Sequence, residues 1–220
     1  MNKVIIINGT HRFSQEELDI LMQYVPQEKQ ERVKRFHHKQ DASNCLIGDV
    51  LTRLEICNTI GLCNNQLEFS TNEYGKPLLV NNPGIHFNIS HTGQYVAFVM
   101  STEPVGIDIE LIKNADLKIA ERFFTPDEIA YIKEDNSNMR FYEVWTKKES
   151  RIKWEGKGLH LPLNSFSVLD TKEHLYYHNI FQNNEVICHV CSQNFTIPSI
   201  ELMNTEGFIK KVIEFTKDYI

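Results

Sequence analysis

Residues 105–110 read Val-Gly-Ile-Asp-Ile-Glu, and residues 145–153 read Trp-Thr-Lys-Lys-Glu-Ser-Arg-Ile-Lys. The first stretch is short, largely apolar and rich in β-branched residues, which predicts a strand. On a strand, Asp108 and Glu110 lie two residues apart and point the same way. The second stretch predicts a helix, on which Trp145, Glu149 and Lys153 recur every four residues and share one face. These two elements are expected to organise the rest of the chain.

Two carboxylates from a strand, a third from a helix and a nearby lysine suit a hard divalent cation and a phosphate group. Each pair also has a simpler interpretation. Glu149 and Lys153 match a solvated i,i+4 ion pair. Asp108 and Glu110 match the polar face of an edge strand, although two carboxylates in an apolar run repel each other unless a cation lies between them. From the residues alone, these alternatives stay open.

Composition limits the function classes. The chain has 220 residues, of which 41% are hydrophobic, enough for one domain or two small ones with a sizeable core. Its apolar runs are far shorter than the roughly 20 residues that span a bilayer, and its start lacks a signal peptide, so a cytoplasmic location is expected. A net charge of −6 without an aromatic-basic repeat argues against nucleic acid or membrane partners.

The five cysteines are odd in number and do not form a disulfide framework. Cys188 and Cys191 have a zinc-like spacing, but no second pair accompanies them, so we expect buried, reduced cysteines. Basic residues gather twice, early from Lys29 to Lys39 and late from Lys147 to Lys157. Two solvated helix faces explain them as well as two phosphate-binding patches do.

Periodicity and punctuation predict a mixture of helices and strands, hence an α+β fold. The terminal helix is expected to turn Phe208, Ile209, Val212, Ile213 and Phe215 inward. Predicted helices cover residues 14–24, 27–36, 41–60, 117–124, 126–132, 141–155 and 205–219. Predicted strands cover residues 4–7, 67–70, 85–91, 95–100, 105–110, 165–169, 175–181, 186–192 and 195–197.

The motifs together resemble the 4′-phosphopantetheinyl transferases, specifically the Sfp type. The resemblance covers roughly residues 1–170, and the last 45 or so match loosely. Its motifs, in the family's order, are 35–39 (Arg-Phe-His-His-Lys), 48–51 (Gly-Asp-Val-Leu), 74–77 (Tyr-Gly-Lys-Pro), 87–91 (Phe-Asn-Ile-Ser-His), 106–110, 145–153, 155–159 (Glu-Gly-Lys-Gly-Leu) and 161–168 (Leu-Pro-Leu-Asn-Ser-Phe-Ser-Val).

The resemblance implies a reaction and a fold. The 4′-phosphopantetheine arm of coenzyme A passes to a serine of an acyl, peptidyl or aryl carrier protein, and 3′,5′-ADP is released. Mg²⁺ is the expected cofactor, with Mn²⁺ as an alternative. Two similar α+β halves, residues 1–104 and 105–220, are related by a pseudo-two-fold axis, with coenzyme A in the cleft between them. A monomer serving nonribosomal peptide, polyketide or antibiotic biosynthesis is expected.

The resemblance also assigns roles to residues. Asp108, Glu110 and Glu149 become metal ligands, and Glu149 or a metal-bound water takes the serine proton. Lys153, Ser90 and His91 contact phosphate, so that Glu149, Lys153 and His91 form the catalytic set. Lys29 and Arg32 resemble the pair that binds the 3′-phosphate, and Tyr74, Gly75, Lys76 and Pro77 resemble the adenine-binding turn.

Carrier proteins are usually acidic, so a basic patch should meet them. We expect it at Lys118, Arg122, Lys147 and Arg151, beside Phe123 and Phe124. Arg151 stands where the family usually has an apolar residue. Two other functions remain: a Mg²⁺-dependent hydrolase of nucleotide pyrophosphates, and a non-catalytic module that binds carrier or coenzyme.

Overall fold

A computed structural model describes residues 3–9, 13–135, 137–170, 174–194, 196 and 198–219. None of the helices in these ranges is both long and apolar enough to cross a membrane. The helices are α1 (Gln15–Met22), α2 (Gln27–Lys34), α3 (Lys39–Ile60), α4 (Leu117–Phe123), α5 (Pro126–Asp135), α6 (Asn138–Glu155) and α7 (Thr205–Tyr219), with short 3₁₀ turns η1 (Asn64–Gln66), η2 (Gly158–His160) and η3 (Leu163–Ser165). The strands are β1 (Lys3–Asn8), β2 (Phe69–Thr71), β3 (Pro77–Leu79), β4 (His86–Thr92), β5 (Tyr95–Ser101), β6 (Val105–Leu111), β7 (Tyr176–Gln182), β8 (Val186–Ser192) and β9 (Ser199–Asn204).

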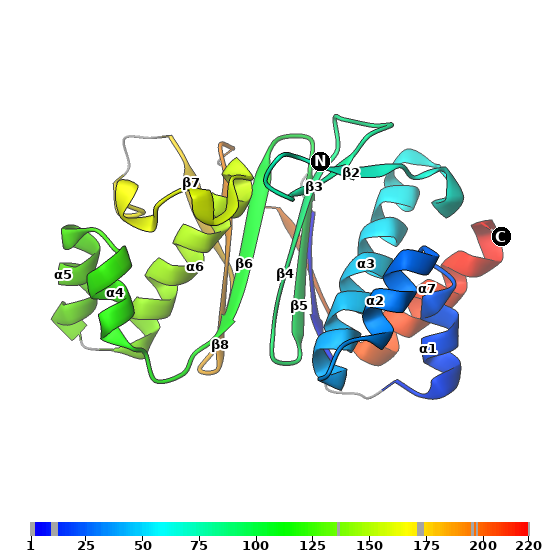
Figure 1. Cartoon of the computed structure of the whole chain (residues 1–220), viewed down its shortest axis with the longest axis horizontal. Coiled ribbons are helices and arrows are strands. Elements are labelled where there is room, and N and C mark those ends of the chain that lie inside the picture. Colours follow the sequence, from blue (N-terminus) through cyan, green and yellow to red (C-terminus); the bar gives the residue numbers. More distant parts are fainter. Residues whose placement is uncertain are drawn as a thin grey trace.

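Two sheets stand at the centre of the molecule, each with helices on its outer side (Figure 1). One sheet has the strand order β4-β5-β1-β9 and is covered by α1, α2, α3 and α7. The other has the order β6-β8-β7 and is covered by α4, α5 and α6, while β2 and β3 form a separate ribbon. The predicted α+β class with two halves is therefore confirmed, and each half places a long helix against a sheet.

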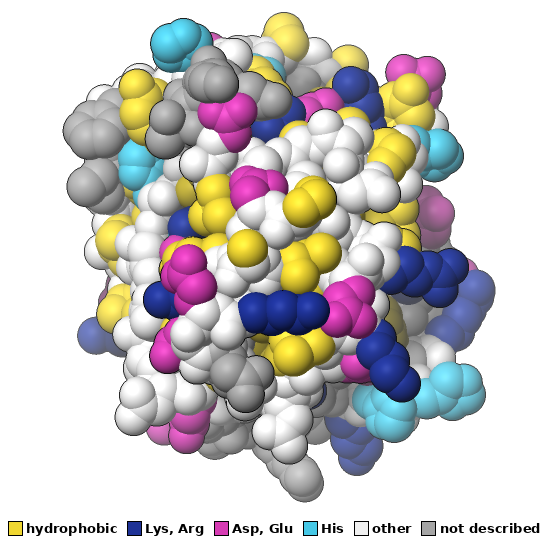
Figure 2. Space-filling view, turned by 90° about the vertical axis from the view of Figure 1, so that its left-hand side faces the viewer, with side chains coloured by type: hydrophobic (Ala, Val, Ile, Leu, Met, Phe, Trp, Pro, Cys, Tyr) yellow, Lys and Arg dark blue, Asp and Glu magenta, His cyan; other side chains and the backbone are white. Residues whose placement is uncertain are grey.

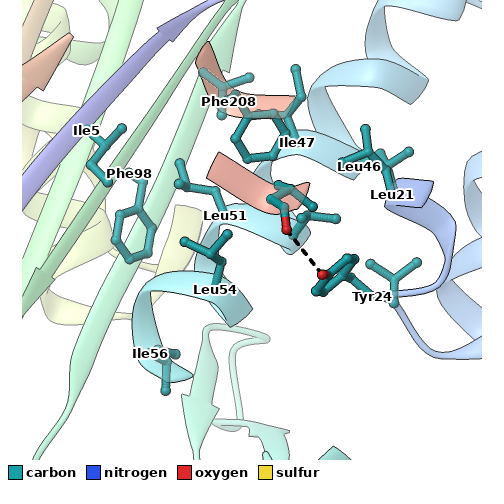
Figure 3. Close-up of a cluster of buried hydrophobic side chains, with 14 of the residues drawn as sticks. Ile5, Leu21, Tyr24, Leu46, Ile47, Leu51, Leu54, Ile56, Phe98 and Phe208 are labelled. Carbon is teal, nitrogen blue, oxygen red and sulfur yellow. Dashed lines mark hydrogen bonds between the residues drawn. The ribbon is translucent and has the colours of Figure 1, made fainter. Parts of the chain in front are cut away.

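Strand β1 contributes side chains to two hydrophobic clusters, one on each face of its sheet. Ile5 and Ile7 point toward α3 and join the cluster drawn in Figure 3, whereas Val4 and Ile6 point toward the second sheet. Because successive strand residues face opposite sides, a continuous apolar run fits a strand buried on both faces. The layer between the sheets is thus apolar, and the two halves share one interior.

The chain returns to its first half at the end. Strand β9 pairs in parallel with β1, and α7 buries Phe208 and Val212 in the first cluster, where the Tyr24 hydroxyl donates to the Val212 carbonyl at 3.3 Å (Figure 3). Residues 199–219 were assigned by sequence to the second half but pack on the first. The division at 104/105 stays a prediction.

Some predictions from the last part of the chain do not hold or are not covered. Ile213 is 37% exposed and does not face inward. Its position falls outside the buried stripe that Phe208, Val212 and Phe215 form on α7. The strand predicted over 195–197 includes Phe195 and Ile197, which lie outside the described residues.

The strand predicted over residues 165–169 is wrong. This segment follows η3 and pairs with no strand in the described structure, because its backbone is bonded to side chains instead. The Lys148 ammonium donates to the Leu163 and Phe166 carbonyls at 2.7 and 2.8 Å, and the Val168 amide donates to Glu128 at 2.8 Å. Lys148 and Glu128 form a 2.8 Å ion pair with both side chains 0% exposed. Hydrogen bonds to the buried Lys148–Glu128 ion pair thus take the place of hydrogen bonds to a neighbouring strand.

Helix α6 approaches β6 closely at Gly106. A Cβ at this position would lie 2.0 Å from the Ser150 carbonyl oxygen and 2.4 Å from the Trp154 amide nitrogen. Both neighbours are backbone atoms, which cannot rotate away. Only glycine allows this contact, and the contact sets how near α6 lies to the acidic face of β6.

We expect Gly106→Ala to destabilise the protein by about 3 kcal/mol or more, because helix and strand must separate. Urea unfolding measures the change. Gly84→Ala is the matched control, since its Cβ would meet only the Asn82 side chain at an ordinary 3.7 Å. If both variants unfold at the same urea concentration, the close approach does not constrain the fold.

Candidate active site

The two sheets meet along the edges of β4 and β6, which belong to different sheets and are joined by side chains. Three side chains of β4, two residues apart, accept hydrogen bonds from three alternate amides of β6. The bonds are Ile107 N–H to Asn88 Oδ1 at 2.9 Å, Ile109 N–H to Ser90 Oγ at 3.4 Å and Leu111 N–H to Thr92 Oγ1 at 3.3 Å. We call this set the β4–β6 seam.

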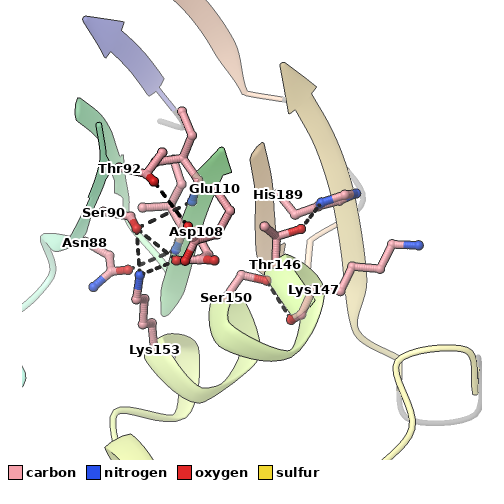
Figure 4. A network of polar contacts seen from close by, with 12 residues as sticks. Asn88, Ser90, Thr92, Asp108, Glu110, Thr146, Lys147, Ser150, Lys153 and His189 are labelled. Carbon is pink, nitrogen blue, oxygen red and sulfur yellow. Dashed lines mark hydrogen bonds and ion pairs between the residues drawn. The ribbon is translucent and has the colours of Figure 1, made fainter. Parts of the chain in front are cut away.

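Two seam hydroxyls also hold the carboxylates of β6 (Figure 4). Ser90 donates to Asp108 Oδ1 at 2.8 Å, and Thr92 donates to Glu110 Oε2 at 3.2 Å. Each hydroxyl therefore accepts from the backbone of β6 and donates to its side chains. Asp108 and Glu110 lie two residues apart on β6 and so share one face. Ser90 and Thr92, their partners, lie two residues apart on β4 and share a face in the same way.

Lys153 of α6 reaches this face from the other side. Its ammonium donates to Asp108 Oδ1 at 2.6 Å and to Ser90 Oγ at 2.8 Å (Figure 4). Among the described ion pairs, Lys153 pairs with Asp108 and not with Glu149 one turn earlier. The interpretation of Glu149 and Lys153 as a solvated i,i+4 pair is therefore wrong.

The acids are too buried for the polar face of an ordinary edge strand. Asp108 is 3% exposed, and its Oδ2 atom is buried without a hydrogen-bond partner. Burial and the Asp108 charge raise the pKa of Glu110 to about 7, against hydrogen bonds from Thr92 and Trp145 and the charge of Lys153. Burial and Asp108 also raise the pKa of Glu149, which Lys153 opposes. Negative charge is thus in excess here.

The donor set fits a hard divalent cation. Within the described ranges, no three His, Cys, Asp or Glu side chains already converge as a metal site, and Asp108 Oδ1 is turned toward Lys153. The unpartnered Asp108 Oδ2 nevertheless lacks a positive partner, and carboxylate oxygens are the ligands that Mg²⁺ and Mn²⁺ prefer. Asp108, Glu110 and Glu149 are the residues that would hold the ion.

A cavity of about 980 Å³ opens over these groups. Its lining combines charged, polar and apolar side chains. Desolvation and the Lys153 charge lower the pKa of His91, and this favours a neutral imidazole. The lining residues are Ile89, Ser90, His91, Asp108, Glu110, Arg122, Phe123, Trp145, Glu149, Lys153, Leu159, Leu161, Pro162, Leu163 and Asn164.

Lys29 and Arg32 do not line this cavity. Lys29 pairs with Asp49 of α3 at 2.8 Å, and Arg32 is exposed on the same helix as Lys29. Asp41, two turns before Asp49 on one face of α3, is close enough to act on the pKa of His91. Eight residues of helix span about 12 Å, which is the rise along α3 between the partner of Lys29 and the acid that acts on His91. Their role at the 3′-phosphate stays a prediction.

The turn between β2 and β3 is clamped to the end of α6. The Lys76 ammonium donates to the carbonyls of Val105, Lys153 and Trp154 at 3.2, 2.6 and 3.3 Å. Asn72 adds a 2.8 Å bond to the Gly156 carbonyl. Burial lowers the pKa of Lys76 to about 8. The Lys76 side chain therefore caps a helix and is committed to protein partners.

The rest of the turn remains open to a ligand. Tyr74 is 39% exposed, and its ring centroid lies 5.2 Å from that of His160 in the other half. Gly75 and Pro77 are also exposed. A planar base could rest on this edge, so the adenine contact stays a prediction for Tyr74, Gly75 and Pro77.

The predicted carrier surface is only partly available. Phe124 is buried, and Arg151, 9% exposed, lies 4.2 Å over the Phe166 ring and bonds to Glu155, so both predictions were wrong. The late basic cluster is no patch either, because Lys148 is fully buried. Figure 2 views the α4–α6 side and shows basic, acidic and apolar side chains interspersed. Arg122, stacked 5.1 Å over Phe123, remains at the cavity.

Sequence reasoning missed several residues that build the site. Asn88 and Thr92 carry the seam, and the polar alternation of β4 was the signal that could have found them. Glu128 and Lys148 support the cavity wall, because the Lys148 ammonium binds the carbonyl of Leu163, which lines the cavity. Trp145 also hydrogen-bonds Glu110.

Comparisons with known proteins identify the family of the chain. Two family models match, described as 4′-phosphopantetheinyl transferase, N-terminal, over residues 10–103, and 4′-phosphopantetheinyl transferase superfamily over residues 104–204. The chain is 49% identical to 4′-phosphopantetheinyl transferase ffp and 47% identical to 4′-phosphopantetheinyl transferase Sfp, both of Bacillus subtilis, over 70% of each chain. It is 37% identical to 4′-phosphopantetheinyl transferase gsp of Aneurinibacillus migulanus, over 76% of this chain and 70% of the relative.

The raised pKa of Glu110 predicts a pH effect on stability in metal-free protein. The folded state keeps a proton up to about pH 7, while the unfolded state releases it near the ordinary value of 4.5. Glu110 therefore lowers stability as pH rises from 4.5 through 7. We expect Glu110→Gln to remove this loss.

Urea unfolding of wild type and Glu110→Gln in the presence of a chelator, from pH 4.5 to 8, measures the difference in their free energies of unfolding. Glu73→Gln, at an exposed turn position, is the control and should follow the wild type. Parallel curves for wild type and Glu110→Gln would show that Glu110 ionises normally.

Proposed function

The chain belongs to the 4′-phosphopantetheinyl transferase superfamily, in its Sfp type, and we propose that it transfers the 4′-phosphopantetheine arm of coenzyme A to a serine of an apo carrier protein. Asp108, Glu110 and Glu149 hold a divalent cation in this proposal, and Mg²⁺ fits their oxygens as well as Mn²⁺. Acyl, peptidyl and aryl carrier proteins are the acceptors. The enzyme acts as a monomer.

One observation carries the proposal: the two distant signatures, 106–110 and 145–153, line one cavity together with Ser90 and His91. Neither a solvated helix nor an edge strand requires Lys153 to cross to Asp108 at 2.6 Å. The cavity combines buried acids, an ammonium and an imidazole, which together suit a diphosphate and its counter-ion.

The transferred group is a phosphoryl carrying pantetheine. The serine oxygen forms a bond to this phosphorus, the phosphorus–oxygen bond to 3′,5′-ADP breaks, and the serine proton goes to a base. When bound, the cation neutralises charge on the diphosphate. Lys153 and His91, which both line the cavity, bind phosphate oxygens and hold the group in place.

Glu149 is the residue we propose as proton acceptor. Burial and Asp108 raise its pKa, and a base whose pKa is closer to the working pH accepts a proton more readily. A water in the site remains the alternative acceptor.

The other contacts follow from the size of the coenzyme. Lys29 and Arg32, on the helix α2 that the Lys29–Asp49 ion pair joins to α3, bind the 3′-phosphate. Tyr74, Gly75 and Pro77 contact adenine, while Lys76 supports the turn. We keep the division into halves at 104/105, with β9 and α7 returning to the first half.

The test is the intact mass of an apo carrier after incubation with enzyme, coenzyme A and Mg²⁺. We expect the mass of one phosphopantetheinyl group to be added, and the gain to fall at least about 100-fold in rate with Asp108→Ala. Glu73→Gln should leave the rate unchanged. A hydrolase would release 3′,5′-ADP without any carrier, and a binding module would do neither.

Arg122 offers a test of the carrier side. We expect Arg122→Glu to raise KM for an acidic carrier about 10-fold, through repulsion, while KM for coenzyme A stays the same. Lys210→Glu on α7, 77% exposed, is the charge-matched control in the other half. An unchanged KM for carrier in Arg122→Glu would exclude this surface.

A further inference from the structure

Lys153 stands where the acid cluster most needs positive charge. Its ammonium lies 2.6 Å from Asp108 Oδ1, and its charge also acts on Glu110 and Glu149. Asp108 Oδ1 is also bonded to Ser90, whereas Oδ2 is buried and has no partner. An ion entering the cluster must compete with Lys153 for Asp108.

The side chain of Lys153 can leave this position without moving the helix. It is 26% exposed and lines the cavity, so the ammonium can turn toward a ligand there. Its backbone is fixed, because its carbonyl accepts from Lys76 at 2.6 Å and the helix is pressed against Gly106. Movement is therefore confined to the side-chain torsions of Lys153.

We propose that Lys153 is an exchangeable counter-ion, which holds Asp108 in the ligand-free protein, opposes metal binding there, and moves to the coenzyme's phosphate when metal and coenzyme enter together. This inference rests on the proposed function, because it needs the metal site and the coenzyme. It adds that Lys153 weakens the binding of metal to the acid cluster when coenzyme is absent.

A counter-ion and a residue that only binds phosphate differ in their effect on metal affinity when coenzyme is absent. A residue that only binds phosphate has no effect on metal affinity in the absence of coenzyme. A counter-ion that competes with the metal lowers that affinity, so its removal must increase it. Coenzyme binding is affected in the reverse direction, because the phosphate loses its ammonium.

Mn²⁺ titration of the full chain, followed by the electron paramagnetic resonance of free Mn²⁺, measures this directly. Without coenzyme, we expect Lys153→Met to bind Mn²⁺ about 10-fold more tightly than wild type. Lys157→Met is the matched control: it removes the same charge nearby, where Lys157 is 50% exposed and pairs with Glu155, and should change the affinity little.

The outcomes separate this inference from the function it rests on. Equal Mn²⁺ affinity in Lys153→Met and wild type, or equal gains in both lysine variants, overturns the counter-ion while the metal site stands. No Mn²⁺ binding to wild type even with coenzyme A overturns the metal site and the inference with it.

A measurement on wild type avoids any doubt about folding of the variant. The rate at which an amine-acylating reagent labels Lys153, read by mass spectrometry, reports whether the ammonium is held. We expect Mn²⁺ alone, at saturating concentration, to increase this labelling at least about threefold by displacing Lys153. Adding coenzyme A should reverse the increase. Labelling that Mn²⁺ does not change would contradict the proposal.

Discussion

The β4–β6 seam is the constraint on which the rest of the structure depends. Two sheets that end side by side leave a row of amides on β6, and a buried amide without a partner destabilises the fold by about 1–3 kcal/mol. Asn88, Ser90 and Thr92 satisfy that row with side-chain oxygens. Because a hydroxyl can accept and donate at once, the same bonds that join the halves also orient Asp108 and Glu110.

Helix α6 is fixed to this seam from the other side by backbone contacts. Gly106 lets it lie directly on β6, and Lys76 caps its last carbonyls from the first half of the chain. Lys148 extends from its middle to hold the cavity wall. The helix that carries Glu149 and Lys153 is therefore located at three points. Within the site, the side chains can move while the backbone of α6 stays fixed. This suits groups that must exchange partners without disturbing the fold.

Sequence alone predicted what depends on local pattern. The strands predicted over 85–91 and 95–100, and the helices predicted over 14–24 and 141–155, are found as β4, β5, α1 and α6. The structure adds a capping box at Ser14, and α6 ends at Gly156 in the left-handed region. The same periodicities put Asp108 and Glu110 on one strand face, and Glu149 and Lys153 on one helix face. The family resemblance then supplied the reaction. The resemblance is confirmed by relatives that are 49% and 47% identical to the chain.

What sequence did not predict depends on partners distant along the chain. Lys148 looks like its neighbour Lys147 in the sequence, yet only Lys148 meets a buried Glu128 twenty residues earlier. The segment after η3 has strand-like residues, but the buried ion pair takes its backbone bonds. The return of β9 beside β1 joins two ends of the chain, and no local pattern reports a parallel pairing over that separation.

The acid cluster itself works against stability. Burial raises the pKa of Glu110 and of Glu149, and the Asp108 charge raises both further, so each ionised carboxylate makes the next less favourable. The Lys153 charge offsets only part of this repulsion. An apolar layer between the sheets and a helix held at three points supply the rigidity that keeps such a cluster assembled. If protein groups already neutralised and hydrogen-bonded every carboxylate oxygen of the cluster, a cation would gain little by binding there. The unpartnered Oδ2 atom of Asp108 is therefore the feature that makes the cluster able to bind one.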